Sequence, residues 1–448
     1  MGFRGLTMAI VFLILDGLAD RPQGLLGRIT PLEAAETPNL DRLASLGSNG
    51  LLDPLGPGIP MGSETAHFLI FGYPLEDFPG RAVIEAMGRD ILLEPGDVLC
   101  LASFATVIPD GRRLIRKRLA YEHPESIDEK AFVALSETIS AFEHEGITVE
   151  LRYTGRGEGI LFLQGKVSPH FTDSDPFGDE QPILKVRPLE GPEMDLAQRA
   201  SEALNAYLMW VCERLKDHSI NRDRGEPINF LVTKWSGRFP EKPPLPFSVK
   251  YGLKGVAIEN GPLYVGIARF LGLEPMEIPS EKDVARDMDR KIKCALESLE
   301  AGYDFAYLHT KAPDVEGHKG KPLLKARALE AIDRSLDPLV RRVREDRGFL
   351  LVVTGDHGTP SSGGMLHSGD SIPILFAGMN VLEDDVSRFN ERDAARGSLG
   401  HVRGLDIMNI ALNLTDRANL YGVRHSPFRI PSVPSDPVPL EVPPDSLK

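Results

Sequence analysis

Short apolar runs that do not alternate with polar residues recur near both ends of the chain. They lie at residues 9–15, 305–308, 349–353 and 372–377. Strands that are buried on both faces, as in parallel sheets, show this pattern. A helix with proline in its first turn is expected over residues 37–43, and residues 325–344 place apolar side chains at helical spacing. Because strands alternate with helices, the sequence predicts an α/β fold with a mainly parallel, doubly wound sheet.

The middle of the chain carries a different pattern. Amphipathic helices are expected near residues 128–144 and 196–216, and alternating strands at residues 148–153 and 159–163. We therefore predict an inserted α+β domain over residues 79–237.

This insertion divides the predicted core domain into residues 1–78 and 238–422. The remaining residues, 423–448, contain seven prolines and few large apolar side chains. We expect such a tail to wrap the surface or to stay disordered.

The 448 residues include 65 acidic and 51 basic ones, which gives a net charge of −14. A field of this sign repels polyanions. Three dispersed cysteines without CxxC spacing indicate a reducing compartment, and the first apolar run is too short to span a bilayer. We therefore expect a cytoplasmic protein with no nucleic-acid or membrane partner, whose oligomeric state the sequence does not specify.

Acidic and histidine side chains gather where the predicted strands end. They are Asp16, Asp314, His318, Asp356, His357 and His367. In open α/β sheets the carboxyl ends of the strands face the ligand crevice. Carboxylate and imidazole together suit Zn²⁺ or Mn²⁺ better than Mg²⁺ or Ca²⁺, which prefer oxygen ligands. The set is large enough for two metal ions, which together can clamp the attacking and leaving oxygens of a phosphoryl group.

Ser63 supplies a candidate nucleophile, because it follows Gly62 at the start of a predicted helix, where free N–H groups attract phosphate. Each residue taken singly also has an ordinary structural interpretation. Ser63, Asp16 and Asp356 could cap helices, and His367 could lie in a surface loop. The joint arrangement favours a site, because four separate segments each place such a residue at a strand end or a helix start.

Five segments carry a resemblance to a known family. They are Ile-Leu-Asp-Gly at 14–17, Met-Gly-Ser-Glu-Thr-Ala at 61–66, Lys-Ala-Pro-Asp-Val-Glu-Gly-His at 311–318, Thr-Gly-Asp-His-Gly-Thr-Pro at 354–360, and His367. Together they resemble the alkaline phosphatase superfamily and, within it, the archaeal-type cofactor-independent phosphoglycerate mutases. The similarity extends to about residue 422.

The resemblance implies two metal ions and a covalent intermediate. One ion would be held by Asp314, His318 and His367, and the other by Asp16, Asp356, His357 and the Ser63 oxygen. Ser63 would become phosphoserine and return the phosphoryl group to the other hydroxyl of the same glycerate. The inserted domain would grip the glycerate and keep it from escaping. Lys291 matches a family lysine that could stabilise developing charge, with a solvated helix lysine as the alternative.

The chain departs from the family where the substrate would be recognised. Leu101-Ala102-Ser103 replaces an Arg-Cys-Asn triplet, and Ser280-Glu281-Lys282 replaces Ala-Thr-Gly. The predicted function is interconversion of 3-phosphoglycerate and 2-phosphoglycerate. The alternative is a phosphomonoester hydrolase or phosphotransferase that acts on another small phosphorylated metabolite. A catalytically silent regulatory relative is disfavoured, because all seven expected metal ligands are present.

Overall fold

The computed structural model describes residues 8–119, 129–222, 224–418 and 439–441. The chain divides into two compact units, which we describe separately. Unit 1 comprises the residues up to Phe78 and from Pro244 onward, and unit 2 comprises Pro79–Pro243. The C-terminal boundary of unit 2 lies six residues beyond the boundary predicted at 237/238. The predicted proline-rich tail lies outside the described residues except for 439–441.

Unit 1 is built on a mainly parallel sheet of eight strands within the described residues. In sheet order they are β11 (Glu274–Met276), β10 (Gly255–Ile258), β12 (Phe305–Thr310), β1 (Ala9–Leu15), β13 (Phe349–Thr354), β14 (Ile372–Gly378), β2 (Gly47–Leu52) and β15 (Gly400–Val402). The predicted strand at 372–377 is present as β14, but it runs antiparallel to both of its neighbours. All other pairings are parallel.

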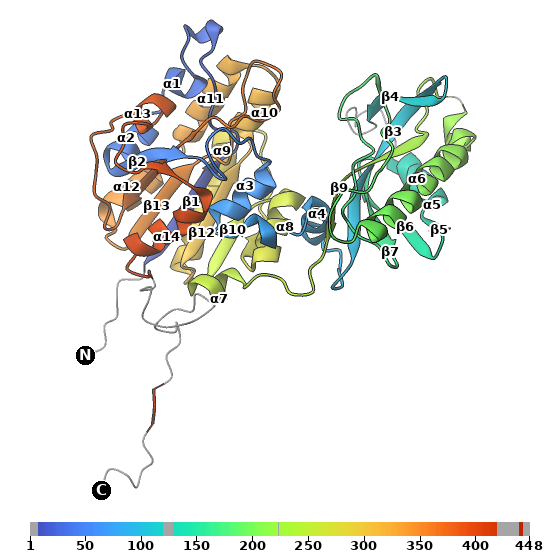
Figure 1. Ribbon diagram of the computed structural model, residues 1–448. Helices are drawn as coiled ribbons and strands as arrows, with labels where there is room; N and C mark the ends of the chain where they lie inside the picture. Colours follow the sequence, from blue (N-terminus) through green and yellow to red (C-terminus); the bar gives the residue numbers. More distant parts are fainter. Residues whose placement is uncertain (1–7, 120–128, 223, 419–438, 442–448) are drawn as a thin grey trace. The chain divides into compact units, whose positions relative to one another are not determined.

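Helices cover the sheet of unit 1 on both faces (Figure 1). They are α1 (Pro31–Ala34), α2 (Pro38–Ser45), α3 (Ser63–Ile70), α7 (Phe247–Tyr251), α8 (Pro262–Leu271), α9 (Val284–Glu300), α10 (Ala312–His318), α11 (Pro322–Asp333), α12 (Asp337–Glu345), α13 (Glu391–Ala394) and α14 (Gly404–Leu414), with 3₁₀ turns η1 (Gly24–Leu26) and η2 (Leu75–Asp77). The single helix expected at 325–344 is wrong, since α11 and α12 are separate. Pro338 lacks an N–H and its ring would clash with a carbonyl one turn earlier, so the chain restarts there.

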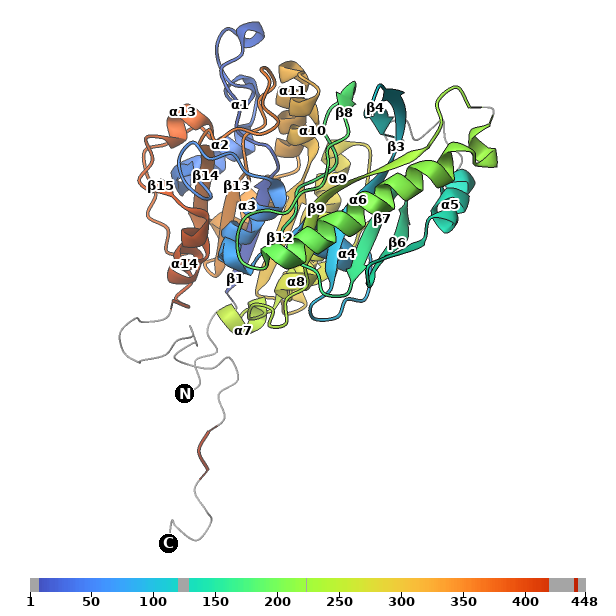
Figure 2. The ribbon, with the colours of Figure 1, turned by 45° about the vertical axis from the view of Figure 1, so that its right-hand side comes forward.

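Unit 2 is an antiparallel sheet with helices, which agrees with the predicted α+β class. Its described strands are β5 (Ala141–His144), β6 (Ile147–Gly155), β7 (Glu158–Gln164), β3 (Val98–Asp110), β4 (Arg113–Leu119) and β8 (Gln181–Pro182), and β9 (Phe230–Arg238) also pairs with β3. The helices are α4 (Arg81–Gly88), α5 (Glu129–Thr138) and α6 (Met194–Lys216), with the 3₁₀ turn η5 (Ser219–Asn221). Figure 2 shows the long helix α6 lying across this sheet.

The helix predicted over residues 128–144 is longer than the helix in the structure. It ends at Thr138, and residues 141–144 form β5 instead. Glu145 and Gly146 both have positive φ angles, of 48° and 74°. Two such residues in succession make the tight turn of a β-hairpin, which folds β5 back onto β6. Among the helices that the structure describes, none combines the length and the apolar character that crossing a membrane requires.

The register of three neighbouring strands brings the candidate residues together. Leu15 of β1 pairs with Thr310 of β12, and Ile14 pairs with Thr354 of β13. The residues that follow these strands therefore emerge at one edge of the sheet. Gly17 makes the turn after β1 with a φ of 65°, and a Cβ there would lie 2.5 Å from the Thr359 hydroxyl oxygen. Only glycine fits this turn without displacing its neighbours.

A buried lysine ties the loops of this edge to each other. The Nζ atom of Lys325, on α11, donates to the carbonyl oxygens of Ala19 at 3.1 Å and Thr359 at 2.8 Å. It also lies 3.1 Å from a carboxylate oxygen of Asp20, which accepts hydrogen bonds from the backbone and side chain of Ser361. The loop after β1 and the loop after β13 are thereby fixed to the same helix.

Removing this lysine should destabilise unit 1 strongly. Lys325→Met leaves the buried Asp20 carboxylate without its cation, and breaking a buried pair in this way costs about 3–5 kcal/mol. Urea unfolding of the full chain, followed by near-ultraviolet circular dichroism, measures the loss. The double variant Asp20→Asn, Lys325→Met should recover part of the stability, because neither charge remains. A double variant no more stable than Lys325→Met would show that the charge pair is not what holds the loops.

Candidate metal centre

Asp314, His318 and His367 form the first candidate ligand set. Asp314 and His318 lie one turn apart on α10, so both side chains project from one side of the helix. The His318 Nε2 atom lies 3.0 Å from Asp314 Oδ1, and His367 Nε2 lies 3.9 Å from the same oxygen. His367 is oriented by its Nδ1 atom, which lies 2.7 Å from the carbonyl oxygen of Met61. One ligand atom from each of the three residues lies within 4.8 Å of the others.

Asp16, Asp356 and His357 form the second set, and all three are buried. The Nε2 atom of His357 lies 3.3 Å from Asp16 Oδ1 and 3.4 Å from Asp356 Oδ2. Among the described residues, neither of these two carboxylate oxygens has a hydrogen-bond partner. Buried carboxylate oxygens without donors are unfavourable unless a cation compensates them. This arrangement therefore fits a metal ion.

Ser63 lies beside the second set. It is the first residue of α3, it is buried, and its Oγ atom lies 3.0 Å from His357 Nε2. The imidazole rings of His357 and His367 stack with their centroids 3.6 Å apart, so the first and second sets adjoin. The structure thus brings together Ser63 and all six of the other residues that the sequence suggested as metal ligands.

Protonation of the second set depends on its charged neighbours. Burial by itself would raise the pKa of Asp16, but the hydrogen-bonded imidazole of His309 and the nearby imidazole of His357 hold that pKa well below its usual value. Burial would lower the pKa of His357, yet the carboxylates of Asp356 and Asp16 raise it to about 9. A metal ion must displace the His357 proton to bind there, so metal affinity is expected to fall as the pH falls.

The sequence did not indicate the groups behind Asp16. The Tyr264 hydroxyl donates to Asp16 Oδ2 at 2.6 Å, and His309 Nε2 lies 3.0 Å from the same atom. The other ring nitrogen of His309 lies 2.9 Å from Glu259 Oε1. Glu259 directly follows β10, so the rule that identified Asp16 could have found it. Tyr264 lies within α8 and carries no such signal.

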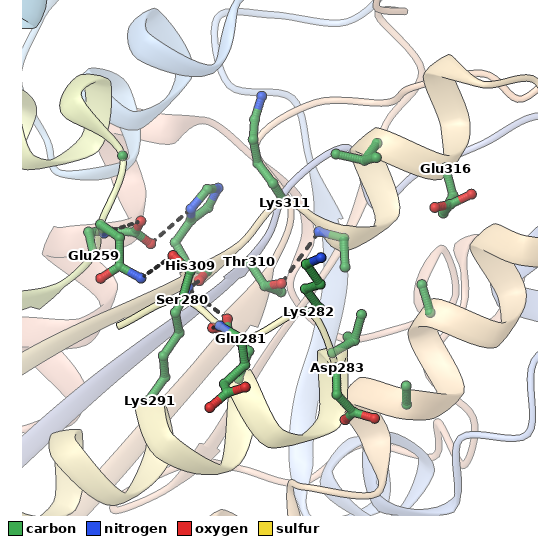
Figure 3. Close-up of a pocket in the computed structure, with 18 of the residues that line it drawn as sticks. Glu259, Ser280, Glu281, Lys282, Asp283, Lys291, His309, Thr310, Lys311 and Glu316 are labelled. Carbon is green, nitrogen blue, oxygen red and sulfur yellow. Dashed lines mark hydrogen bonds and ion pairs between the residues drawn. The ribbon is translucent and has the colours of Figure 1, made fainter. Parts of the chain in front are cut away.

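A cavity of about 660 Å³ is lined by Glu259 and His309, the groups behind Asp16, and by Lys311 (Figure 3). The segment Ser280-Glu281-Lys282, which departs from the family pattern, lines it together with Lys291. Lys291 is buried, and its Nζ atom donates to the His309 carbonyl oxygen at 2.7 Å and lies 3.2 Å from Asp287. These contacts join Lys291 to the cavity wall, and its catalytic role stays a prediction.

Unit 2 contains a pocket of its own, with a volume of about 160 Å³. Its charged lining residues are Arg81, Glu85, Arg89, Glu158 and Lys234, and the segment Leu101-Ala102-Ser103 completes one wall. Three cations thus face two carboxylates. Burial lowers the pKa of Lys234, although Asp175 and Glu158 act in the opposite direction.

An unusual backbone conformation shapes this pocket. Trp235 has a φ of 55°, where the pairing between β9 and β3 shifts register. Its ring lies 4.0 Å from the Arg81 guanidinium carbon and 4.6 Å from Lys234 Nζ. Strained residues and β-bulges are concentrated at binding sites, where they redirect side chains.

Comparison with known proteins identifies the family. A family model described as the Metalloenzyme superfamily matches residues 8–414. The chain is 39% identical, over 93% of its length and 95% of the relative's, to 2,3-bisphosphoglycerate-independent phosphoglycerate mutase 2 of Methanocaldococcus jannaschii. It is 34% identical to the 2,3-bisphosphoglycerate-independent phosphoglycerate mutase of Methanopyrus kandleri, over 94% of this chain and 100% of that protein.

Two solved structures share the fold. A protein from Pyrococcus horikoshii superposes with a TM-score of 0.74 at 32% identity, over 94% of this chain and 100% of that one. The cofactor-independent phosphoglycerate mutase from Thermoplasma acidophilum gives a TM-score of 0.61 at 29% identity, over 91% and 100%.

These similarities span nearly the whole chain and confirm both the predicted fold class and the predicted resemblance. Membership of the Metalloenzyme superfamily implies binding of divalent metal, which agrees with the two ligand sets. The chain belongs to the Metalloenzyme superfamily and, within it, to the family of 2,3-bisphosphoglycerate-independent phosphoglycerate mutases.

Proposed function

We propose that this chain interconverts 3-phosphoglycerate and 2-phosphoglycerate by phosphoryl transfer through Ser63. One observation above all supports the proposal. Ser63 begins α3 with its hydroxyl oxygen 3.0 Å from His357 Nε2, in the second ligand set, which adjoins the first through the stacked rings of His357 and His367. The named relatives are mutases of this kind. We place the enzyme in the cytoplasm, where its three free cysteines stay reduced.

The two ligand sets would hold two divalent ions, Mn²⁺ or Zn²⁺, because each set combines carboxylate with imidazole. Such ions favour the ionised form of a serine hydroxyl and neutralise charge on a phosphoryl group. Asp16 and Asp356 offer the buried, unpartnered oxygens for the second ion, and Thr359 orients Asp314 for the first by donating to its Oδ1 atom at 2.7 Å.

The proposed reaction has two steps, transfer of the phosphoryl group to Ser63 and its transfer back to the glycerate. The Ser63 oxygen forms a bond to phosphorus while the bond from phosphorus to the glycerate oxygen breaks. The proton that Ser63 loses is matched by the proton that the released glycerate hydroxyl gains. Transfer from phosphoserine to the neighbouring hydroxyl reverses these steps. The first N–H groups of α3 favour the phosphoryl charge, as helix N-termini do.

The pocket of unit 2 is the proposed binding site for the glycerate. Its cations Arg81, Arg89 and Lys234 suit a carboxylate, and charge-assisted hydrogen bonds of this kind are strong. The same pocket also favours a second candidate function. Leu101 and Ala102 line it where the family resemblance predicts Arg and Cys, so a different small phosphorylated metabolite, or water as the phosphoryl acceptor, is the alternative.

The purified full chain, supplied with Mn²⁺ and 3-phosphoglycerate, should form 2-phosphoglycerate without net release of phosphate. Both products are measured in the same reaction. Ser63→Ala should abolish turnover and the phosphorylated enzyme seen by intact-mass spectrometry after acid quenching. Ser45→Ala, at an exposed serine of α2, is the matched control and should change neither. Phosphate release without 2-phosphoglycerate would identify a phosphatase, and a phosphorylated Ser63→Ala enzyme would exclude Ser63 as the nucleophile.

Lys234→Met should weaken glycerate binding while leaving metal content unchanged. A charge-assisted hydrogen bond contributes about 1.5–3 kcal/mol, so KM should rise about 10- to 100-fold. Lys185→Met, at an exposed lysine of the same unit, serves as the control. Steady-state kinetics with 3-phosphoglycerate measures both variants. If KM for Lys234→Met equals that of the control, the unit 2 pocket does not hold the substrate.

A further inference from the structure

Lys311 holds a position between the two ligand sets. It directly follows β12 and precedes α10, the helix that carries Asp314 and His318. Its Nζ atom lies 3.2 Å from Asp314 Oδ2, in the first set, and 3.8 Å from Asp16 Oδ2, in the second. A single ammonium group therefore compensates carboxylates of both candidate metal sites.

Two other lysines near this edge are placed differently. Lys291 is buried against the His309 carbonyl and Asp287, and Lys325 is fully buried against Asp20. The side chain of Lys311, by contrast, is 48% exposed. Figure 3 shows its side chain extended away from those of Lys291 and Lys282. Its backbone directly follows the last residue of β12, while about half of its side chain is open to solvent.

A divalent ion at either set would compete with this ammonium group. Both cations would be attracted to the same carboxylates, and at a few ångströms they would repel each other. The ion carries the larger charge and has imidazoles as further ligands at each set, so the ammonium group is the one that yields. Because the side chain is half-exposed, the ammonium group can turn to an incoming anion beside both sets without unfolding its surroundings.

We infer that Lys311 is a mobile catalytic cation that neutralises the carboxylates before metal loading and contacts the oxygens of the transferring phosphoryl group afterwards. The inference rests on the proposed function only for the identity of the phosphoryl donor. It assigns Lys311 two opposite effects. Lys311 competes with metal binding, and it favours binding of phosphate to the loaded enzyme. A lysine that merely supported the ligand geometry would favour both.

The test measures these two effects separately in the full chain. In Lys311→Met, Mn²⁺ should bind about fivefold more tightly by isothermal titration, because a unit charge about 4 Å from the ligands is gone. Inorganic phosphate should bind to the Mn²⁺-loaded variant about tenfold or more weakly, the loss of one charge-assisted hydrogen bond. Lys311→Arg keeps the charge and should restore most of the phosphate affinity.

Lys293→Met is the matched control, because Lys293 is exposed on α9 and pairs with Glu297. It should change neither affinity. Weaker or unchanged Mn²⁺ binding in Lys311→Met would overturn the competition, and unchanged phosphate binding would overturn the phosphoryl contact. Neither measurement uses phosphoglycerate. Failure of the wild-type enzyme to isomerise 3-phosphoglycerate would therefore refute the proposed function without deciding the role of Lys311.

Discussion

The arrangement of unit 1 depends on three carboxylates that converge at one edge of its sheet. Asp16, Asp314 and Asp356 are all almost fully buried, and the second set alone contains two of them. Burying like charges together is strongly unfavourable unless cations or hydrogen-bond donors compensate them. His309 and Lys311 compensate part of this negative charge through their contacts with Asp16 and Asp314. Asp16 Oδ1 and Asp356 Oδ2 still have no hydrogen-bond donor among the described residues. A site that suits divalent ions is what makes such a concentration of negative charge tolerable.

The rest of unit 1 holds these charges in register. Parallel pairing of β1 with β12 and β13 fixes where each ligand leaves the sheet, and fully buried apolar strands make that pairing rigid. The loops beyond the strand ends are not held by strand pairing of this kind. Lys325 supplies the missing contacts, because its ammonium group binds carbonyl oxygens of two loops at once. One buried cation thus fixes both the loop after β1, which carries Asp16, and the loop after β13, which carries Asp356.

The sequence predicted the elements that have a local signal. Apolar runs followed by Asp or His predicted β1, β12 and β13 and pointed to Asp16, Asp314, Asp356 and His357. The helix predicted over residues 128–144 was wrong at its end, because the tight turn at Glu145-Gly146 pairs residues 141–144 with β6. The antiparallel direction of β14 carries no local signal, because it depends on pairing with β2, which is distant in sequence. Tyr264 could not be found, because its role depends on α8 packing beside Asp16.

The net charge of −14 describes the whole chain and not the places where an anion would bind. In unit 1, ions at the two sets would reverse the local sign. In unit 2 the balance is set by three cations against two carboxylates, so a single substitution in that pocket changes its net charge. Catalysis and recognition therefore respond differently to sequence change. On the proposed function, the metal sets need nearly every residue that they contain, whereas an exchange of Arg for Leu in the unit 2 pocket would alter specificity without affecting the phosphoryl chemistry. Divergence of substrate within this family is accordingly expected at the two places where this chain departs from the shared pattern, residues 101–103 in unit 2 and residues 280–282 in unit 1.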